Sequence, residues 1–138
     1  MNQEYPLVGV AYATRGHSQQ WWHSQVRGGL ASAGWRIPQV YALLHNYAEL
    51  SEIHVDPAAQ GHGLGEKMLR ALLSTRTEKY VLLSTPEVPG EANRAWSLYR
   101  RLNFEDVLRH FHFSGESRPF AVLGARLPLA VEKPKANS

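Results

Sequence analysis

The hydrophobic positions of this chain fall into two patterns, and the first predicts strands. β-branched and aromatic residues cluster in five short segments that glycine and proline border. The predicted strands are residues 7–13, 49–55, 80–84, 107–113 and 120–127. Their spacing leaves room for helices between them.

The second pattern is an apolar stripe at helical spacing, which occurs twice. The first stripe consists of Leu64, Met68, Leu69, Leu72 and Leu73, and the second of Ala92, Ala95, Trp96, Tyr99 and Leu102. Residues 19–30 predict a further short helix, residues 32–38 a loop, and residues 41–47 fit either a helix or a strand. We expect one domain over residues 1–132 and a frayed tail over residues 133–138.

A glycine-dense turn joins the strand that ends at Val55 to the helix that begins near Leu64. Gly61, Gly63 and Gly65 carry no side chain, so the backbone of the turn can approach a ligand closely. The start of the helix adds unpaired N–H groups and a partial positive charge. The turn therefore predicts a site for an anionic, phosphate-bearing ligand.

Spacing decides which phosphate-binding loop this is. A Walker loop and a dinucleotide fingerprint both fail, because Glu66 follows Gly65 where each motif requires another residue. The turn instead resembles the acyl-CoA pyrophosphate loop of the GNAT superfamily of N-acyltransferases, [QR]-x-x-G-x-[GA], through Gln60, Gly63 and Gly65. Val55-x-Pro57 before it is also typical of that family.

A second segment, residues 91–104, resembles the later helix of the same family, N-x-x-A-x-x-L-Y-x-x-x-G-F. Asn93, Tyr99 and Phe104 match the pattern, and Asn103 replaces its glycine. Asparagine tolerates the left-handed conformation that ends a helix, so we expect the same turn there. Two motifs in the right order are more specific than either alone.

The resemblance implies a mixed α/β fold with a central sheet in which residues 49–55 and 80–84 are parallel strands that splay apart. It implies acetyl-CoA as co-substrate, with the pantetheine arm in the gap. The implied contacts are Ile53, His54 and Val55 from the strand, Gln60, Gly61, His62, Gly63, Leu64 and Gly65 from the loop, and Asn93 from the later helix. Asn93 has an equal alternative, which is to cap its own helix.

The reaction implied by the family is direct attack of an amine on the thioester. Tyr99 takes the position that donates a proton to the departing thiolate, and the alternative is that it only packs in the core. Glu49 is the candidate base and Glu52 the second choice. Because side chains alternate along a strand, we do not expect both carboxylates to face the acceptor, and an exposed structural role is as well supported for either.

The beginning of the chain departs from the family pattern. Residues 7–13 resemble the family's second strand, so the usual first strand and the two helices after it, which form one wall of the acceptor pocket, are missing. Residues 19–47, a second subunit or a longer protein are the three alternatives for that wall. We expect a homodimer, with Trp21, Trp22, Trp35 and Tyr41 as candidates for the contact or for the rebuilt pocket.

Composition narrows the function further. The 138 residues include no cysteine, which excludes disulfides and thiolate chemistry, and no apolar run is long enough to span a bilayer. We expect a cytoplasmic protein without a membrane or nucleic-acid partner. The seven histidines contain no H-E-x-x-H, and His110 and His112, on one strand face, lack a third ligand, so we expect no metal.

These observations predict an N-acetyltransferase that acts on a primary amine, which the sequence does not identify. An alternative is a catalytically silent acyl-CoA-binding module. A weaker third interpretation, a basic nucleic-acid-binding domain, rests only on the net charge of +3.

Overall fold

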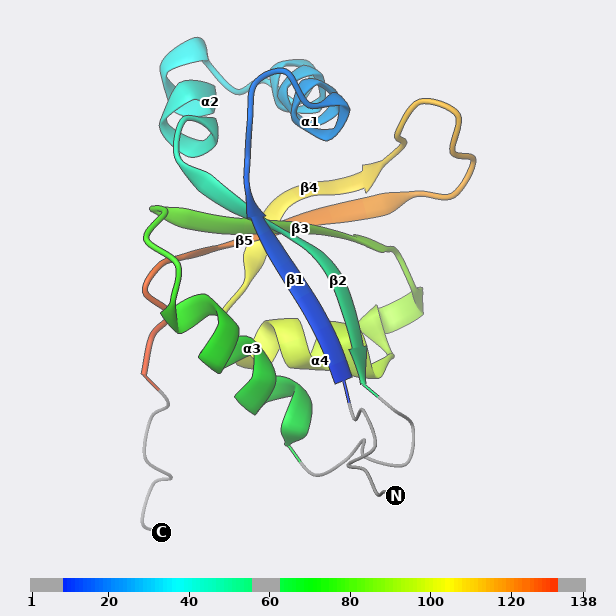
Figure 1. Ribbon diagram of the computed structural model, residues 1–138. Coiled ribbons are helices and arrows are strands. Elements are labelled where there is room, and N and C mark those ends of the chain that lie inside the picture. Colours follow the sequence, from blue (N-terminus) through cyan, green and yellow to red (C-terminus); the bar gives the residue numbers. More distant parts are fainter. Residues whose placement is uncertain (1–8, 56–62, 132–138) are drawn as a thin grey trace, which may run out of the picture.

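A five-stranded mixed sheet forms the centre of the protein (Figure 1). The computed structural model describes residues 9–55 and 63–131. The sheet has the order β1-β2-β3-β5-β4. Its strands are β1 (Gly9–Arg15), β2 (Tyr47–Val55), β3 (Tyr80–Pro86), β4 (Glu105–Phe111) and β5 (Phe120–Arg126). β2 and β3 are parallel, whereas the other neighbours are antiparallel. The predicted α/β class is therefore confirmed.

Helices cover both faces of the sheet (Figure 1). α1 (Trp21–Ser32) and α2 (Ile37–Leu44) lie on one face, and α3 (Leu64–Ser74) and α4 (Arg94–Arg101) on the other. A short 3-10 turn, η2 (Pro89–Glu91), precedes α4. Alternate residues of the central strands point into two separate cores, which explains why β3 and β5 are almost continuously apolar.

The predicted elements agree with the structure except around α2. Residues 32–38 were expected to form a loop, but Ile37 and Pro38 already belong to α2. Proline fits the first helical turn, where its missing N–H has no intrahelical partner, and Gln39 Oε1 accepts a hydrogen bond from Arg36 N at 2.9 Å. The ambiguous residues 41–47 divide into the end of this helix and the start of β2. The predicted tail, residues 133–138, lies outside the described residues.

The end of α4 has the turn that the second motif predicts. Asn103 adopts a φ of 66°, in the left-handed region. Phe104 N donates to Tyr99 O at 3.0 Å and Asn103 N to Arg100 O at 3.0 Å, the two bonds of a Schellman motif. Asparagine thus replaces the family's glycine without changing the turn.

The parallel strands β2 and β3 separate soon after they begin. Their paired positions are Tyr47 with Tyr80, Ala48 with Val81, and Glu49 with Leu82. Beyond these pairs β2 continues to Val55 beside β1, and β3 continues to Pro86 beside β5. The predicted splay is confirmed, and it begins directly after Glu49.

Candidate functional site

The gap between the diverging strands is the framework of the candidate site. Leu50 and Leu83 are the first residues past the last paired position, and both are buried in the core that α3 and α4 cover. From there the facing backbone edges of β2 and β3 form no ladder with each other. A ligand that offers amide groups along its length fits such a gap, because it can satisfy these edges as an added strand does.

α3 begins at Leu64, directly after Gly63 of the glycine-dense segment. Gly63 is the N-cap of α3 with φ 73° and ψ 10°, and Lys67 N donates to Gly63 O at 3.1 Å. A Cβ at Gly63 would meet no atom of the described residues within 4 Å, so the positive φ explains the glycine here. Leu64 and Gly65 form the first turn of the helix.

Some of the predicted contact residues lie outside the described residues, and others are described as backbone alone. Gln60, Gly61 and His62 lie outside the described residues. Ile53, His54 and Val55 are described as backbone of β2, where each pairs with β1. Their roles therefore stay predictions.

Tyr99 lies in the core on the α4 face of the sheet. It is 6% exposed and belongs to the same buried cluster as Leu50 and Leu83. Burial raises the pKa of Tyr99 to about 12, so the phenol keeps its proton at neutral pH. No described residue forms a hydrogen bond with its hydroxyl. A buried donor of this kind needs a partner, and a ligand in the gap would supply one.

Glu49 lies at the same level of the sheet but points to the opposite face. It shares this face with Tyr47, two residues earlier on β2, whose ring is buried beneath α1 and α2. The carboxyl is half-buried, and burial raises its pKa above the ordinary value. Glu49, at the start of the gap, and Tyr99 therefore lie on opposite faces of the sheet.

β2 is not a regular strand between Glu49 and Glu52. β2 carries an irregularity at this point, because Ala13 pairs with Leu50 and Tyr12 with Glu52, which leaves Ser51 as an extra residue. Such a bulge interrupts the alternation of side chains. The regular alternation that predicted opposite faces for Glu49 and Glu52 is therefore interrupted at Ser51.

The α1 face contributes polar contacts that the sequence analysis did not predict. His23 is 5% exposed, and its Nδ1 lies 2.9 Å from the Tyr47 hydroxyl. Burial, together with the nearby Glu49 charge, raises the pKa of Tyr47 to about 12. Trp22 Nε1 donates to Ser84 Oγ at 3.2 Å, which fixes α1 over β3 beside the gap. One signal was available, since His23 stands on the buried stripe of Val26 and Leu30.

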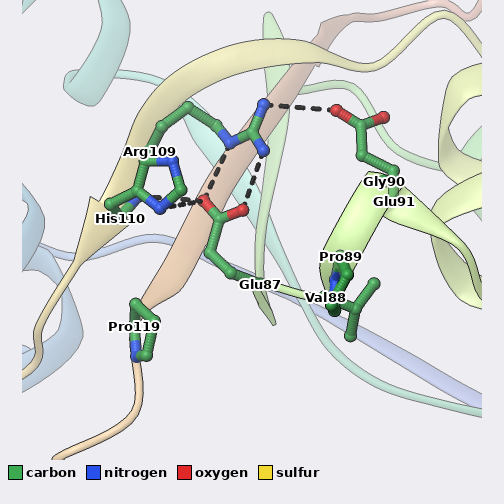
Figure 2. Close-up of a pocket in the computed structure, with 8 residues that line it drawn as sticks. All are labelled: Glu87, Val88, Pro89, Gly90, Glu91, Arg109, His110 and Pro119. Carbon is green, nitrogen blue, oxygen red and sulfur yellow. Dashed lines mark hydrogen bonds and ion pairs between the residues drawn. The ribbon is translucent and has the colours of Figure 1, made fainter.

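A group of ion pairs closes the far end of β3 (Figure 2). Both oxygens of Glu87 accept hydrogen bonds from Arg109, at 2.7 and 2.8 Å, and one also accepts from His110 N at 2.9 Å. The Arg109 bonds hold the pKa of Glu87 at about 2. Arg109 also pairs with Glu91 at 3.2 Å, beside a hollow of about 550 Å³. Because the Glu87 carboxylate is saturated, it anchors the strand and is unsuited to act as a base.

The same ion pairs help to position α4. The guanidinium groups of Arg100 and Arg109 lie 5.2 and 5.0 Å from the ring of Trp96, which is fully buried. Trp96 Nε1 donates to Pro86 O at 2.9 Å and so connects α4 to the end of β3. Tyr99 lies three residues further along α4, so this connection helps to fix the helix that carries it.

Asn93 begins α4 as its N-cap. Its Oδ1 accepts a hydrogen bond from Trp96 N at 2.8 Å, which is the capping role that stood as the alternative to cofactor binding. The amide nitrogen of the same side chain is not used by this bond. A contact to the coenzyme therefore stays a prediction for Asn93.

The histidine pair considered for a metal is not arranged on one regular strand face. β4 ends at Phe111, and His110 has a φ of 52°, which breaks the alternation before His112. Within residues 9–55 and 63–131, no group of three histidine or acidic side chains is placed to hold a metal ion.

Comparison with known sequences points to one family. A family model described as an acetyltransferase (GNAT) domain matches residues 18–106. A GCN5-like protein acetyltransferase of Mycobacterium tuberculosis is 52% identical over 124 residues, which cover 90% of this chain and 60% of that relative. The N-alpha-acetyltransferase RimI of the same species is 39% identical over 70 residues, 49% of this chain and 42% of RimI. The chain thus spans only part of the length of these relatives.

Solved structures share the fold. An agmatine N-acetyltransferase superposes with a TM-score of 0.60 at 17% identity and covers 91% of this chain and 74% of its own. An N-acetyltransferase from Staphylococcus aureus gives 0.59 at 18% identity, with 91% and 67% covered. Arabidopsis thaliana NAA60 in complex with acetyl-CoA gives 0.56 at 16% identity, with 88% and 66% covered.

Proposed function

Because this chain belongs to the GNAT acetyltransferase family, we propose that it transfers an acetyl group from acetyl-CoA to a primary amine by direct attack. The observation that carries the proposal is the separation of β2 and β3 directly after Glu49, with Tyr99 in the core on one face of the sheet and Glu49 on the other face. The left-handed N-cap Gly63 adds a helix start suited to the pyrophosphate.

In the proposed reaction the two faces of the sheet have different tasks. The acceptor approaches from the α1 face, where Glu49, directly or through a water, takes a proton from its ammonium group. The free amine then attacks the thioester carbonyl, and backbone N–H groups along the gap stabilise the oxyanion. Tyr99 gives its phenolic proton to the thiolate as the carbon–sulfur bond breaks, the nitrogen of the new amide loses its second proton to water, and the Tyr99 phenolate takes a proton back from water.

α1 and α2 are the proposed substitute for the missing acceptor wall. They occupy the sheet face opposite α3 and α4, and Trp22 contacts Ser84 beside the gap. The name of the most similar relative reported above, a protein acetyltransferase, favours a protein amino group as the acceptor. A library of peptides and small amines, with thiol release as the readout, would identify it.

Acetyl-CoA should stabilise the purified chain, because a ligand that binds only the folded state shifts the unfolding equilibrium. At about 100 times the dissociation constant we expect the melting temperature to rise by roughly 5–10 °C. Gly63→Val should abolish this rise, since valine strains the positive φ and places branched carbons where the backbone meets the pyrophosphate.

Gly34→Val is the matched control for that measurement. Gly34 also has a positive φ, 94°, and a Cβ there meets no atom within 4 Å, but it follows α1, away from the turn before α3. Both variants should melt earlier than the parent, and only Gly63→Val should lose the response to acetyl-CoA. An undiminished response in Gly63→Val would contradict the assignment of the loop. Binding without acetylation of any amine would instead support a silent acyl-CoA-binding module.

We also propose a homodimer in the cytoplasm. Trp22 and Trp35 are partly buried beside the sheet and between α1 and α2, whereas Trp21 and Tyr41 are 57% and 67% exposed and are the candidate contacts. Among the described residues, no helix is long and apolar enough to cross a bilayer. Sedimentation equilibrium should give twice the 15.5 kDa chain mass, and Trp21→Ser should shift the protein toward the monomer. A parent protein that is monomeric at micromolar concentration would contradict the dimer.

A further inference from the structure

A hollow between α1 and α2 is separate from the candidate acetyl-transfer site. The two helices lie side by side on one face of the sheet (Figure 1), and the space between them has a volume of about 550 Å³. This volume is within the range of small-molecule sites. Its walls are mostly apolar and include Ala31, Trp35, Ile37, Val40 and Leu44. Neither Glu49 nor Tyr99 lines it.

Ser18 and Tyr41 add neutral hydroxyl groups to the lining of this hollow, and its other polar side chains are basic. His23, Arg27 and His45 contribute to the lining, and no carboxylate does. Arg27 forms no ion pair with a carboxylate of the described residues, although seven other arginines do. The hollow therefore combines an apolar interior with a positive charge that has no described counter-ion.

His23 supplies a buried hydrogen-bonding group at the same place. The side chain is 5% exposed, and its Nδ1 is engaged by the Tyr47 hydroxyl at 2.9 Å. When Nδ1 accepts this bond, the proton of the neutral ring is on Nε2, and no described residue accepts it. A buried donor without a partner is costly, so an acceptor atom bound in the hollow would stabilise this arrangement.

We infer that the hollow between α1 and α2 binds a small carboxylate with an apolar body. The carboxylate would accept hydrogen bonds from Arg27 and from His23 Nε2, while an aliphatic or aromatic body fills the space beside Trp35 and Val40. The absence of lining carboxylates disfavours a cationic amine, so this ligand differs in class from the proposed acetyl acceptor. The inference does not depend on the proposed acetyl transfer.

The probe is 4-phenylbutyrate, measured by isothermal titration calorimetry on the full chain. We expect a dissociation constant on the order of 0.1 mM, as for a well-buried ligand of this size. Its neutral amide, 4-phenylbutanamide, has nearly the same shape and should bind about tenfold more weakly, because it lacks the charge that pairs with Arg27. Equal binding of acid and amide, or no binding of the acid at millimolar concentration, would overturn the inference.

Three substitutions on α1, two in the hollow and one control outside it, test where 4-phenylbutyrate binds. Ala31→Phe places a ring in the hollow and should weaken 4-phenylbutyrate binding at least tenfold. Ser24→Phe is its matched control, since Ser24 is also exposed on α1 but does not line the hollow, and binding should be unchanged. Arg27→Gln should weaken binding of the acid and leave the amide unaffected. Melting temperatures confirm that each variant is folded, and unchanged acid binding in both Ala31→Phe and Arg27→Gln would place the ligand elsewhere.

Discussion

Tyr99→Phe should lower kcat by about a hundredfold while leaving the affinity for acetyl-CoA unchanged, since general acid catalysis contributes ~10²–10⁴-fold. The value lies at the low end because a thiolate is already a fair leaving group. The phenol is suited to this role because burial holds its pKa at about 12, so the proton is present at every physiological pH. Phenylalanine keeps the ring against Phe104 and removes only the hydroxyl. Steady-state kinetics with the true acceptor and titration with acetyl-CoA give the two quantities.

Tyr80→Phe controls for the loss of a phenol that is not at the gap. Tyr80 is half-buried at the start of β3, where the strand still pairs with β2. We expect its kcat to stay within about threefold of the parent. If Tyr99→Phe behaves in the same way as Tyr80→Phe, Tyr99 is a packing residue and the departing thiolate takes its proton from water.

Glu49→Gln should lower kcat about tenfold to a hundredfold and, at neutral pH, raise the melting temperature. Burial raises the pKa of Glu49 in the folded state, so stability is lost as the pH rises from the ordinary glutamate pKa through the raised value. Glutamine removes this penalty together with the base. As the pH falls below the ordinary glutamate pKa, the carboxyl is protonated in both states, and the stability difference should disappear. Thermal melts from pH 4 to pH 8 measure it.

Glu78→Gln is a control for which we expect the opposite change in melting temperature. Glu78 is 5% exposed, and its oxygens accept hydrogen bonds from Arg76 at 2.7 and 3.0 Å. These bonds lower the pKa of Glu78, so its charge stabilises the fold above the ordinary glutamate pKa, and this stability is lost as the pH falls through the lowered value. Glu78→Gln should therefore melt earlier at pH 7 with little change in kcat. A Glu49→Gln variant with full activity would exclude Glu49 as the base.

The backbone conformation at the two motifs could be predicted because it depends on neighbouring residues. Gly63 and Asn103 both adopt the left-handed conformation, which few residue types tolerate, so their identities already indicate a helix start and a helix end. The apolar stripes likewise predicted α3 and α4, because a helix must bury one face. Strand and helix ends differ by about two residues in several places, and the largest difference, the loop predicted over residues 32–38 where α2 begins at Ile37, involves Pro38, which occurs both in loops and in first helical turns.

The arrangement of residues around the gap could be predicted from the sequence only through the resemblance to a known family. The meeting of His23 with Tyr47, and of Trp22 with Ser84, joins residues 24 and 62 positions apart, and no local pattern encodes such a pair. The extra residue at Ser51 was also invisible, because a bulge becomes apparent only when two strands are paired.

The sequence by itself thus determined the strands, the helices and the turn that ends α4, since these depend on side-chain shape and on spacing along the chain. Only the tertiary structure decided that Glu49 and Tyr99 lie on opposite faces of the sheet, that β2 and β3 separate directly after Glu49, and that α1 and α2 enclose a basic hollow. The reason is physical: burial and its effect on a pKa come from segments far apart in the chain, and these meet only when the whole core is packed.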